Sequence, residues 1–182
     1  MSETVYHVTT AENATLCLQG GIVPFKRTRS WPTTLQRDEL YDDNRPVHIV
    51  DLDIRRTNSV YAHVGLEHTR KLNGGWLHTC LEEKAVLAIT IPDPTKVYVA
   101  DALLNDDPYT ANEFWASVMS LQFYLQQLRL SRKPTYKAPS SAFGKQFMDK
   151  PEKWNSYYYM WPEVLIPNGV DASAINIVDK IS

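Results

Sequence analysis

The residues with the clearest potential for chemistry are a histidine and a glutamate near opposite ends of the sequence. His7 stands in the strand-forming segment YHVTT, two residues before Thr9. Residues two apart in a strand point to the same face, so an imidazole and a hydroxyl would face one ligand together. Glu163 lies in PEVLIP, a segment otherwise suited to burial, where a carboxylate is costly unless it is paired or faces a cleft. This pattern favours a ligand-binding site, although His7 on an edge strand or Glu163 facing solvent would explain it without one.

A metal centre is the alternative that the other histidines and the cysteines raise. The candidate ligands are His48, His63, His68, His78, Cys17 and Cys80. Their spacings fit no compact zinc pattern, so we expect no metal site. The two cysteines also indicate no disulfide framework, and a reducing cytoplasm is the expected location.

Length and composition indicate a soluble globular chain forming one domain over residues 1–182. Hydrophobic residues make up 43% and charged residues 22%, and no apolar run approaches the roughly 20 residues that span a membrane. We recognise no signal peptide at the N-terminus. The net charge of −2 gives no overall attraction for nucleic acid, but residues 129–153 hold seven basic and two acidic residues, a local charge of +5. Such a run is either a solvated face or a phosphate-binding surface.

The periodicity of apolar residues predicts an α+β fold with several mostly antiparallel strands. The expected strands are 5–9, 59–64, 85–91, 96–102, 161–167 and, after a tight turn at Asn168-Gly169, the segment ASAINIVDK. The expected helices begin at Ala11, with Thr10 as the cap, at Gly65 and at Ala111, the last running to residue 130. Residues 24–58, apart from VHIVDLDI, and residues 131–156 are expected to be long loops.

Four segments in this order resemble the ADP-ribosyltransferase superfamily, in the branch with a His-Tyr-Glu triad that includes diphtheria toxin and the poly-ADP-ribose polymerases. They are YHVTT, SVYAHV, LAITIPDPTKVYVADA and PEVLIP. The third segment looks like the hairpin that the family has at the middle of the chain. The opening and the EVLIP pattern are also similar to the DarT toxins, which modify bases in DNA. The resemblance implies a split antiparallel sheet with flanking helices and long loops.

The resemblance also implies a site for NAD⁺ as co-substrate, with His7, Tyr61 and Glu163 as catalytic residues. Glu163 would stabilise the positive charge that develops on the ribose when the nicotinamide bond breaks, and would hold a ribose hydroxyl. His7 would contact the other ribose, supported by Thr9. The backbone of Val8 would pair with the carboxamide, and the Tyr61 ring would stack on nicotinamide. Arg27 or Arg29 would bind the phosphates.

Two positions depart from the family pattern. Val8 stands where glycine is usual, which narrows the approach to the carboxamide. A second stacking aromatic is usual near the position of Leu72, where none is present, and Trp76 is the nearest substitute. A tyrosine such as Tyr61 also often serves only as core packing in a strand. These departures leave open a weaker NAD⁺ site, or a non-catalytic module of the same fold that binds NAD⁺ or nucleic acid.

The loop before Glu163 faces the acceptor in this superfamily and here reads WNSYYYMWPE. Arginine-specific members carry Gln or Glu two residues before the catalytic Glu, where this chain has Trp161. The loop's aromatic residues follow the +5 segment, and aromatic faces beside cations suit single-stranded nucleic acid. The expected acceptor-binding residues are Lys153, Tyr157, Tyr158, Tyr159 and Trp161. The sequence therefore predicts a mono-ADP-ribosyltransferase that acts on a base of DNA or RNA. A role as a toxin would imply an antidote protein as a partner.

Three alternatives stay open at this point. The aromatic residues of the loop could pack beneath it and hold it to the sheet. The acceptor could be a protein rather than a nucleobase. A phosphotransferase acting on RNA 2′-phosphates is disfavoured, because the opening pattern of those enzymes is absent.

Overall fold

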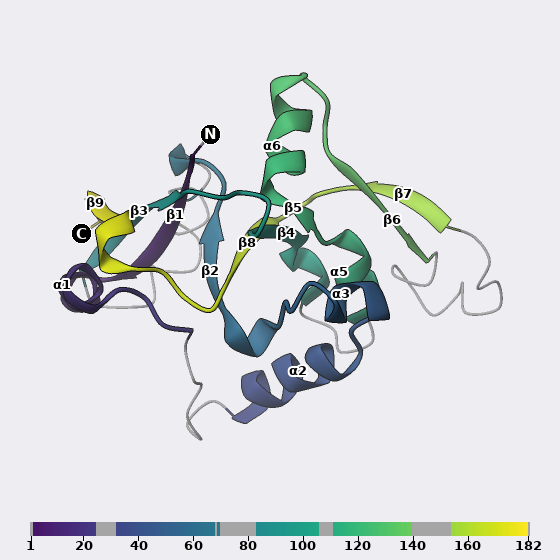
Figure 1. Cartoon of the computed structure of the whole chain (residues 1–182), viewed down its shortest axis with the longest axis horizontal. Helices are drawn as coiled ribbons and strands as arrows, with labels where there is room; N and C mark the ends of the chain where they lie inside the picture. Colours follow the sequence, from purple (N-terminus) through teal and green to yellow (C-terminus); the bar gives the residue numbers. More distant parts are fainter. Residues whose placement is uncertain are drawn as a thin grey trace.

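The structure is a computed structural model that describes residues 2–24, 32–67, 69, 83–105, 111–139 and 154–181. An open seven-stranded sheet forms its centre, in the order β5-β4-β8-β2-β1-β3-β9 (Figure 1). Its strands are β1 (Glu3–Thr10), β2 (Ser59–His63), β3 (Lys84–Ile91), β4 (Tyr98–Asp101), β5 (Met119–Ser120), β8 (Pro162–Pro167) and β9 (Ile175–Ile181). Every pairing among these strands is antiparallel, and the mixed α/β architecture agrees with the α+β class expected from the sequence.

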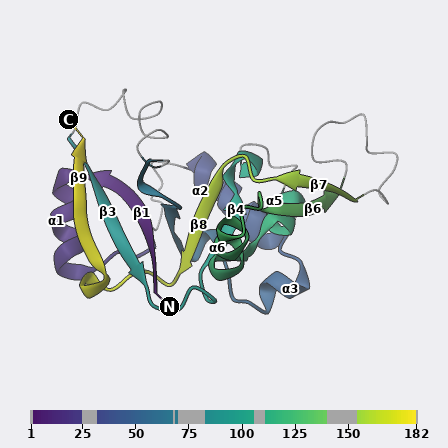
Figure 2. The same ribbon diagram turned by 90° about the horizontal axis from the view of Figure 1, so that it is seen from above.

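The sheet is weakly joined between β1 and β2. These two strands share one residue pair, Tyr6 with His63, whereas β1 and β3 pair from Glu3 to Thr10. β9, β3 and β1 therefore form one half of the sheet and β2, β8, β4 and β5 the other (Figure 2). Strand β1, which carries His7, therefore lies at this weak junction between two well-paired halves of the sheet.

Local sequence explains how β1 passes into the first helix, α1 (Ala11–Gly20). Thr10 is its N-cap, and its hydroxyl accepts a hydrogen bond from the Asn13 N–H at 3.2 Å. The helix ends at Gly20 and is followed by Gly21, whose positive φ of 80° glycine adopts without strain. The predicted strand, cap and stop are confirmed here.

Two hydrophobic cores lie on opposite faces of the sheet, because residues alternate between faces along each strand. One core contains aliphatic residues of β1, β2, β3 and β8 with Ala14 of α1 and Leu121 and Tyr124 of α6 (Leu121–Arg129). The other packs α2 (Pro32–Asp43), α3 (Val47–Val50) and α5 (Ala111–Ser117) against β4 and β8. Tyr61 belongs to the rim of this second core.

Two helix predictions are corrected. Residues 32–43, expected within a loop, form α2, which begins at Pro32, a residue favoured in the first turn of a helix. The single helix expected over 111–130 is two helices, because Met119–Ser120 pair with β4 and Ser120 caps α6 by accepting from the Phe123 N–H. Tertiary pairing thus replaces a helical turn. The helix expected after β2 falls mostly outside the described residues.

The two predicted hairpins are also wrong. β3 and β4 do not pair, since residues 94–97 instead bond to the start of α6 through Leu121 N–H to Val97 O at 2.7 Å. β8 pairs with β2 and β4, whereas β9 pairs with β3 across the sheet. The turn at Asn168-Gly169 packs instead against Ile22, and a Cβ at Gly169 would lie 2.6 Å from the Ile22 oxygen.

Two strands form near the two ends of residues 131–156, which were expected to be one long loop, and they pair as a separate hairpin. β6 (Thr135–Pro139) pairs with β7 (Trp154–Tyr158) in antiparallel register, with Tyr136 opposite Tyr157. The hairpin projects from the β4–β8 half of the sheet, beside α6 (Figure 1). It therefore leads directly into β8, which carries Glu163.

Candidate functional site

His7 and Tyr61 meet between the neighbouring strands β1 and β2. The His7 Nδ1 lies 2.7 Å from the backbone oxygen of Tyr61, which is 54 residues away in the sequence. Tyr6 pairs with His63, which shares a face of the sheet with Tyr61, and His7 points to the other face. The imidazole therefore contacts the backbone of Tyr61, while the Tyr61 ring lies on the opposite face of the sheet.

A pocket of about 500 Å³ opens beside this contact. Its lining includes His7 and Thr9 from β1, Ser59 to Tyr61 from β2, and residues of α1 and the segment after it. The size is in the range of small-molecule sites. His7, Thr9 and Tyr61 thus share one cavity, whereas Glu163 does not belong to its lining.

The hydrogen bond fixes the protonation pattern of His7. A carbonyl oxygen only accepts, so Nδ1 carries the proton and donates to Tyr61. Burial lowers the pKa of His7 below its ordinary value of 6.5, and the bond to Tyr61 offsets this only in part. At neutral pH the imidazole is uncharged, and its Nε2 is a hydrogen-bond acceptor.

Arg56 links Tyr61 to Glu163 on the other side of β2. Tyr61 and Glu163 share a face of the sheet, because Tyr61 pairs with Leu165 and His63 with Glu163. The Arg56 guanidinium lies 5.2 Å from the centroid of the Tyr61 ring, and its Nη1 is 4.0 Å from the Glu163 Oε2. The Glu163 side chain is 15% exposed, so it does not project into solvent from an alternating strand.

Arg56 is held as a buried cation. Its side chain is 1% exposed, its Nε is 3.1 Å from the Asp38 Oδ1, and the Tyr41 and Phe114 rings also lie beside its guanidinium. Burial favours loss of its proton, but Tyr61, Glu163 and Asp38 together raise the pKa of Arg56 above its ordinary value. The cation therefore persists and sets a fixed positive charge beside the Glu163 carboxylate.

Helix α2 supplies the carboxylates that position Arg56. Asp42 accepts from the Arg56 N–H at 2.7 Å and from the Thr57 hydroxyl at 2.6 Å, which fixes the short helix η1 (Arg56–Asn58). Asp38 and Asp42 are spaced i, i+4, so they lie on one face of α2. The sequence interpretation missed Arg56, Asp38 and Asp42. The signal that could have found them is this spacing, once Pro32 is taken as the start of a helix.

The other residues expected to bind NAD⁺ are only partly described. Val8 pairs with Val86 of β3, and its side chain lies on the opposite face of β1 from His7 and Thr9. Arg27, Arg29 and Trp76 lie outside the described residues.

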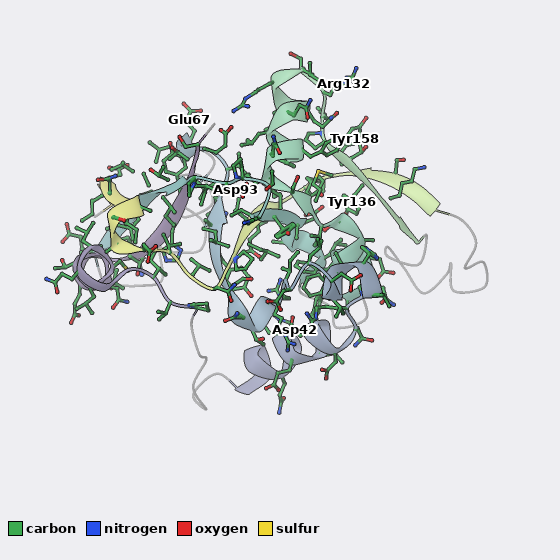
Figure 3. The ribbon with its side chains drawn as sticks, viewed as in Figure 1. Asp42, Glu67, Asp93, Arg132, Tyr136 and Tyr158 are labelled. Carbon is green, nitrogen blue, oxygen red and sulfur yellow. The ribbon has the colours of Figure 1, made fainter. Side chains whose placement is uncertain are left out.

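The aromatic residues expected to bind the acceptor divide into two kinds. Tyr158 is 58% exposed, and the Lys133 ammonium lies 5.6 Å from its ring centroid. It lies beside α6, whereas Asp42 lies with α2 at the other end of the view in Figure 3. Trp161 is partly exposed, the side chain of Tyr157 is outside the described set, and so is Lys153.

Tyr159 belongs to the fold rather than to an acceptor surface. Its ring packs edge-on against Tyr124 and Tyr136, and its hydroxyl donates to the Ser117 oxygen. Burial is the main reason why the pKa of Tyr159 lies above its ordinary value of 10. Its placement in the acceptor-binding set is therefore corrected, because a ring enclosed in this way cannot stack on a base.

The described residues include no group of three His, Cys, Asp or Glu side chains arranged to hold a metal ion. Within the same ranges, none of the helices has the length and apolar character needed to cross a membrane. No protein-family model, curated protein or solved structure matches the chain.

Proposed function

We propose that the chain is a mono-ADP-ribosyltransferase that moves ADP-ribose from NAD⁺ to a base of DNA or RNA and releases nicotinamide. The observation that carries the proposal is the double attachment of Tyr61. Its backbone oxygen holds His7 at 2.7 Å beside the pocket, and its ring contacts the Arg56 cation that lies next to Glu163. The three residues that resemble the family's triad lie on three consecutive strands, β1, β2 and β8. The His7 side chain is on one face of the sheet, and the Tyr61 ring and the Glu163 carboxylate are on the other.

In this proposal the pocket binds part of the dinucleotide NAD⁺, with its ribose hydroxyls facing β1. The neutral His7 offers Nε2 as an acceptor, which suits a ribose hydroxyl, and Thr9 lines the same wall. The Arg56 guanidinium already covers one face of the Tyr61 ring, so a nicotinamide ring would stack on the opposite face. The proposal needs the nicotinamide end of NAD⁺ to pass between β1 and β2, from the face of the sheet that carries His7 to the face that carries the Tyr61 ring and Glu163.

The chemistry asked of Glu163 is electrostatic. The bond between the ribose C1′ and the nicotinamide nitrogen breaks, and its electron pair leaves with nicotinamide. The positive charge left on the sugar is stabilised by the carboxylate, and a nucleophilic atom of the acceptor then bonds to C1′ and loses its proton. Arg56, held by Asp38, restrains the carboxylate so that it needs no reorientation during the reaction.

A nucleobase acceptor is supported by the surface ahead of Glu163. Tyr158, Met160 and Lys133 are exposed there, and the Lys133 cation lies over the Tyr158 ring. Stacking of a base on such a ring contributes about 1–3 kcal/mol, and cations beside it track the phosphates. A protein acceptor is the competing outcome.

Glu163→Gln tests the proposal, because it keeps the size of the side chain and removes its charge. We expect transfer of label from NAD⁺ to single-stranded DNA or RNA to fall by about 10²–10³-fold, with a melting temperature close to that of the unchanged protein. Glu113→Gln is the matched control, since Glu113 is a buried carboxylate on α5. It should leave transfer intact.

Three results would contradict parts of the proposal. Full activity of Glu163→Gln would remove the catalytic role of this carboxylate. Label found only in an added protein pool would replace the nucleobase acceptor with a protein. NAD⁺ binding without release of nicotinamide from the unchanged protein would make the chain a binding module.

A further inference from the structure

A buried carboxylate outside the proposed triad forms hydrogen bonds to the segment that precedes Glu163. Asp101, at the end of β4, is 1% exposed. Its Oδ1 accepts from the Trp161 N–H at 3.0 Å, and its Oδ2 accepts from the Met160 N–H at 3.0 Å. One side chain therefore holds two consecutive backbone N–H groups of the chain that enters β8.

The same carboxylate also anchors the β6–β7 hairpin. The Tyr136 hydroxyl on β6 donates to the Asp101 Oδ2 at 3.1 Å, and Tyr136 pairs with Tyr157 on β7. The backbone N–H of Asp101 donates to the Ser117 hydroxyl of α5 at 2.9 Å, which fixes the residue from behind. Asp101 thus joins β4, α5, the hairpin and the segment 160–161.

This junction lies one residue pair from Glu163. Asp101 pairs with Pro162 and Ala100 pairs with Glu163 across β4 and β8. The Ala102 N–H also donates to the Trp161 oxygen at 2.8 Å, so both backbone groups of Trp161 are held. Any displacement of the carboxylate would move the acceptor-facing segment relative to Glu163.

We infer that Asp101 is a positioning residue that fixes the β6–β7 hairpin and the exposed Tyr158–Met160 surface relative to Glu163, and so sets the partition between transfer to the acceptor and transfer to water. The inference rests on the proposed function. Asp101 acts through Met160, Trp161 and Tyr136 rather than by touching NAD⁺.

The donor pattern requires a carboxylate. Among the described residues, at least three donors point at the two oxygens of Asp101, two backbone N–H groups and one phenol. An asparagine has one oxygen, and its amide nitrogen would place its own hydrogens against an N–H donor. Asp101→Asn therefore preserves the shape of the side chain while reversing at least one hydrogen bond.

The experiment measures transfer and hydrolysis separately in Asp101→Asn. Labelled NAD⁺ is incubated with and without a single-stranded oligonucleotide, and labelled oligonucleotide and free ADP-ribose are quantified. We expect the ratio of transfer to hydrolysis to fall by about 100-fold, the scale of an ångström-sized misplacement, and KM for the oligonucleotide to rise. The backbone amides of Met160 and Trp161 should exchange with solvent faster.

Tyr136→Phe is the milder variant, because it removes one donor and leaves the two backbone contacts. Its ratio of transfer to hydrolysis should fall in the same direction by about tenfold, the lower end of the scale for one hydrogen bond to a charged group. Tyr98→Phe is the matched control. Tyr98 is a buried tyrosine of the same strand as Asp101, but burial and the carboxylate of Asp93 raise the pKa of its hydroxyl, so the ratio should stay unchanged.

The outcomes separate this inference from the proposed function. Equal losses of transfer and hydrolysis in Asp101→Asn and Tyr136→Phe would reduce Asp101 to a stabilising residue and overturn the inference. If the unchanged protein consumes no NAD⁺, the proposed function fails, and the inference fails with it. Unchanged exchange of the Met160 and Trp161 amides in Asp101→Asn would also overturn it, whatever the activity.

Discussion

The two cores on opposite faces of the sheet are built from different chemistry. The core beneath β1, β2 and β3 is almost entirely aliphatic, with residues such as Val5, Leu87 and Ile89 fully buried. The core beneath α2 and α5 is rich in aromatic rings, including Tyr41, Phe114 and Trp115. The two faces position different groups. On the aliphatic face, His7 forms a hydrogen bond to a backbone oxygen. On the aromatic face, the charged side chains of Arg56, Asp38 and Glu163 lie together.

Aromatic rings suit this second task because they are apolar in bulk and present negative faces to a cation. The Arg56 guanidinium lies 4.7 Å from the Phe114 centroid and 5.4 Å from that of Tyr41. The Tyr41 hydroxyl and the Trp115 indole N–H both donate to backbone oxygens, so their polar atoms are satisfied. An aliphatic core would bury the same charge without such partners. The aromatic face can therefore keep Arg56 ionised beside Glu163.

The largest effect should follow from removing the charge on the aromatic face. Arg56→Met removes the cation 3.1 Å from the buried Asp38 carboxylate and breaks a buried ion pair, and we expect a loss of about 3–5 kcal/mol in the free energy of unfolding. The double variant Arg56→Met/Asp38→Leu should recover most of this loss, because it removes both charges. Chemical denaturation measures the stabilities, and labelled NAD⁺ measures activity, which should stay lost in both variants.

Leu87→Ala is the comparison on the aliphatic face. It should cost about 2–5 kcal/mol through the cavity it leaves, yet retain activity below its melting temperature. Recovery of activity in the double variant would show that Arg56 serves stability alone. The contrast between the two faces would then disappear.

Local sequence predicted the elements of this fold better than their partners. YHVTTAEN gave the strand, the cap and the helix, because each depends on neighbouring residues such as Thr10 and Gly21. The pairing of β8 with β2 and β4 could not be predicted in this way. Asn168-Gly169 resembles a hairpin turn, but contacts with Ile22 and Asn58 direct the chain across the sheet.

The candidate site was predictable only in part, for a related reason. His7 and Glu163 stand out by residue type in segments suited to strands, whereas Tyr61 was proposed from its place among the four segments that resemble the family. Arg56 has no such contrast, since charged residues are common in segments that resemble loops, and Asp101 stands at the end of a predicted strand, where an exposed carboxylate is ordinary. Their burial depends on α2, α5 and the hairpin coming together, which is a property of the tertiary fold.

The second prediction concerns pH and the aliphatic face. Burial lowers the pKa of His7, so the folded protein binds this proton less readily than the unfolded chain does. Stability from this group is complete above pH 6.5 and declines as the pH falls through the lowered folded pKa. We expect kcat/KM for NAD⁺ to fall about tenfold per pH unit below that pKa, because protonation removes the Nε2 acceptor.

His7→Gln is the control for this titration, since its amide oxygen can accept near the position of Nε2 but does not titrate. Its kcat/KM should be lower than that of the unchanged protein and flat over the same pH interval. Nuclear magnetic resonance of the His7 ring should give the same midpoint as the kinetics. A midpoint above 6.5 would place His7 beside a negative charge rather than in a desolvated site.

The smallest expected effect belongs to Tyr61, the residue that both faces share. Tyr61→Phe removes the hydroxyl that donates to the Arg56 backbone oxygen at 2.7 Å and keeps the ring, so we expect a loss of about 1 kcal/mol in stability. Tyr61→Leu removes the ring as well. NAD⁺ binding measured by calorimetry should be retained in the first variant and weakened in the second. Equal binding by both would mean that the ring only packs against Arg56, and the aromatic face would then hold the ion without contacting the substrate.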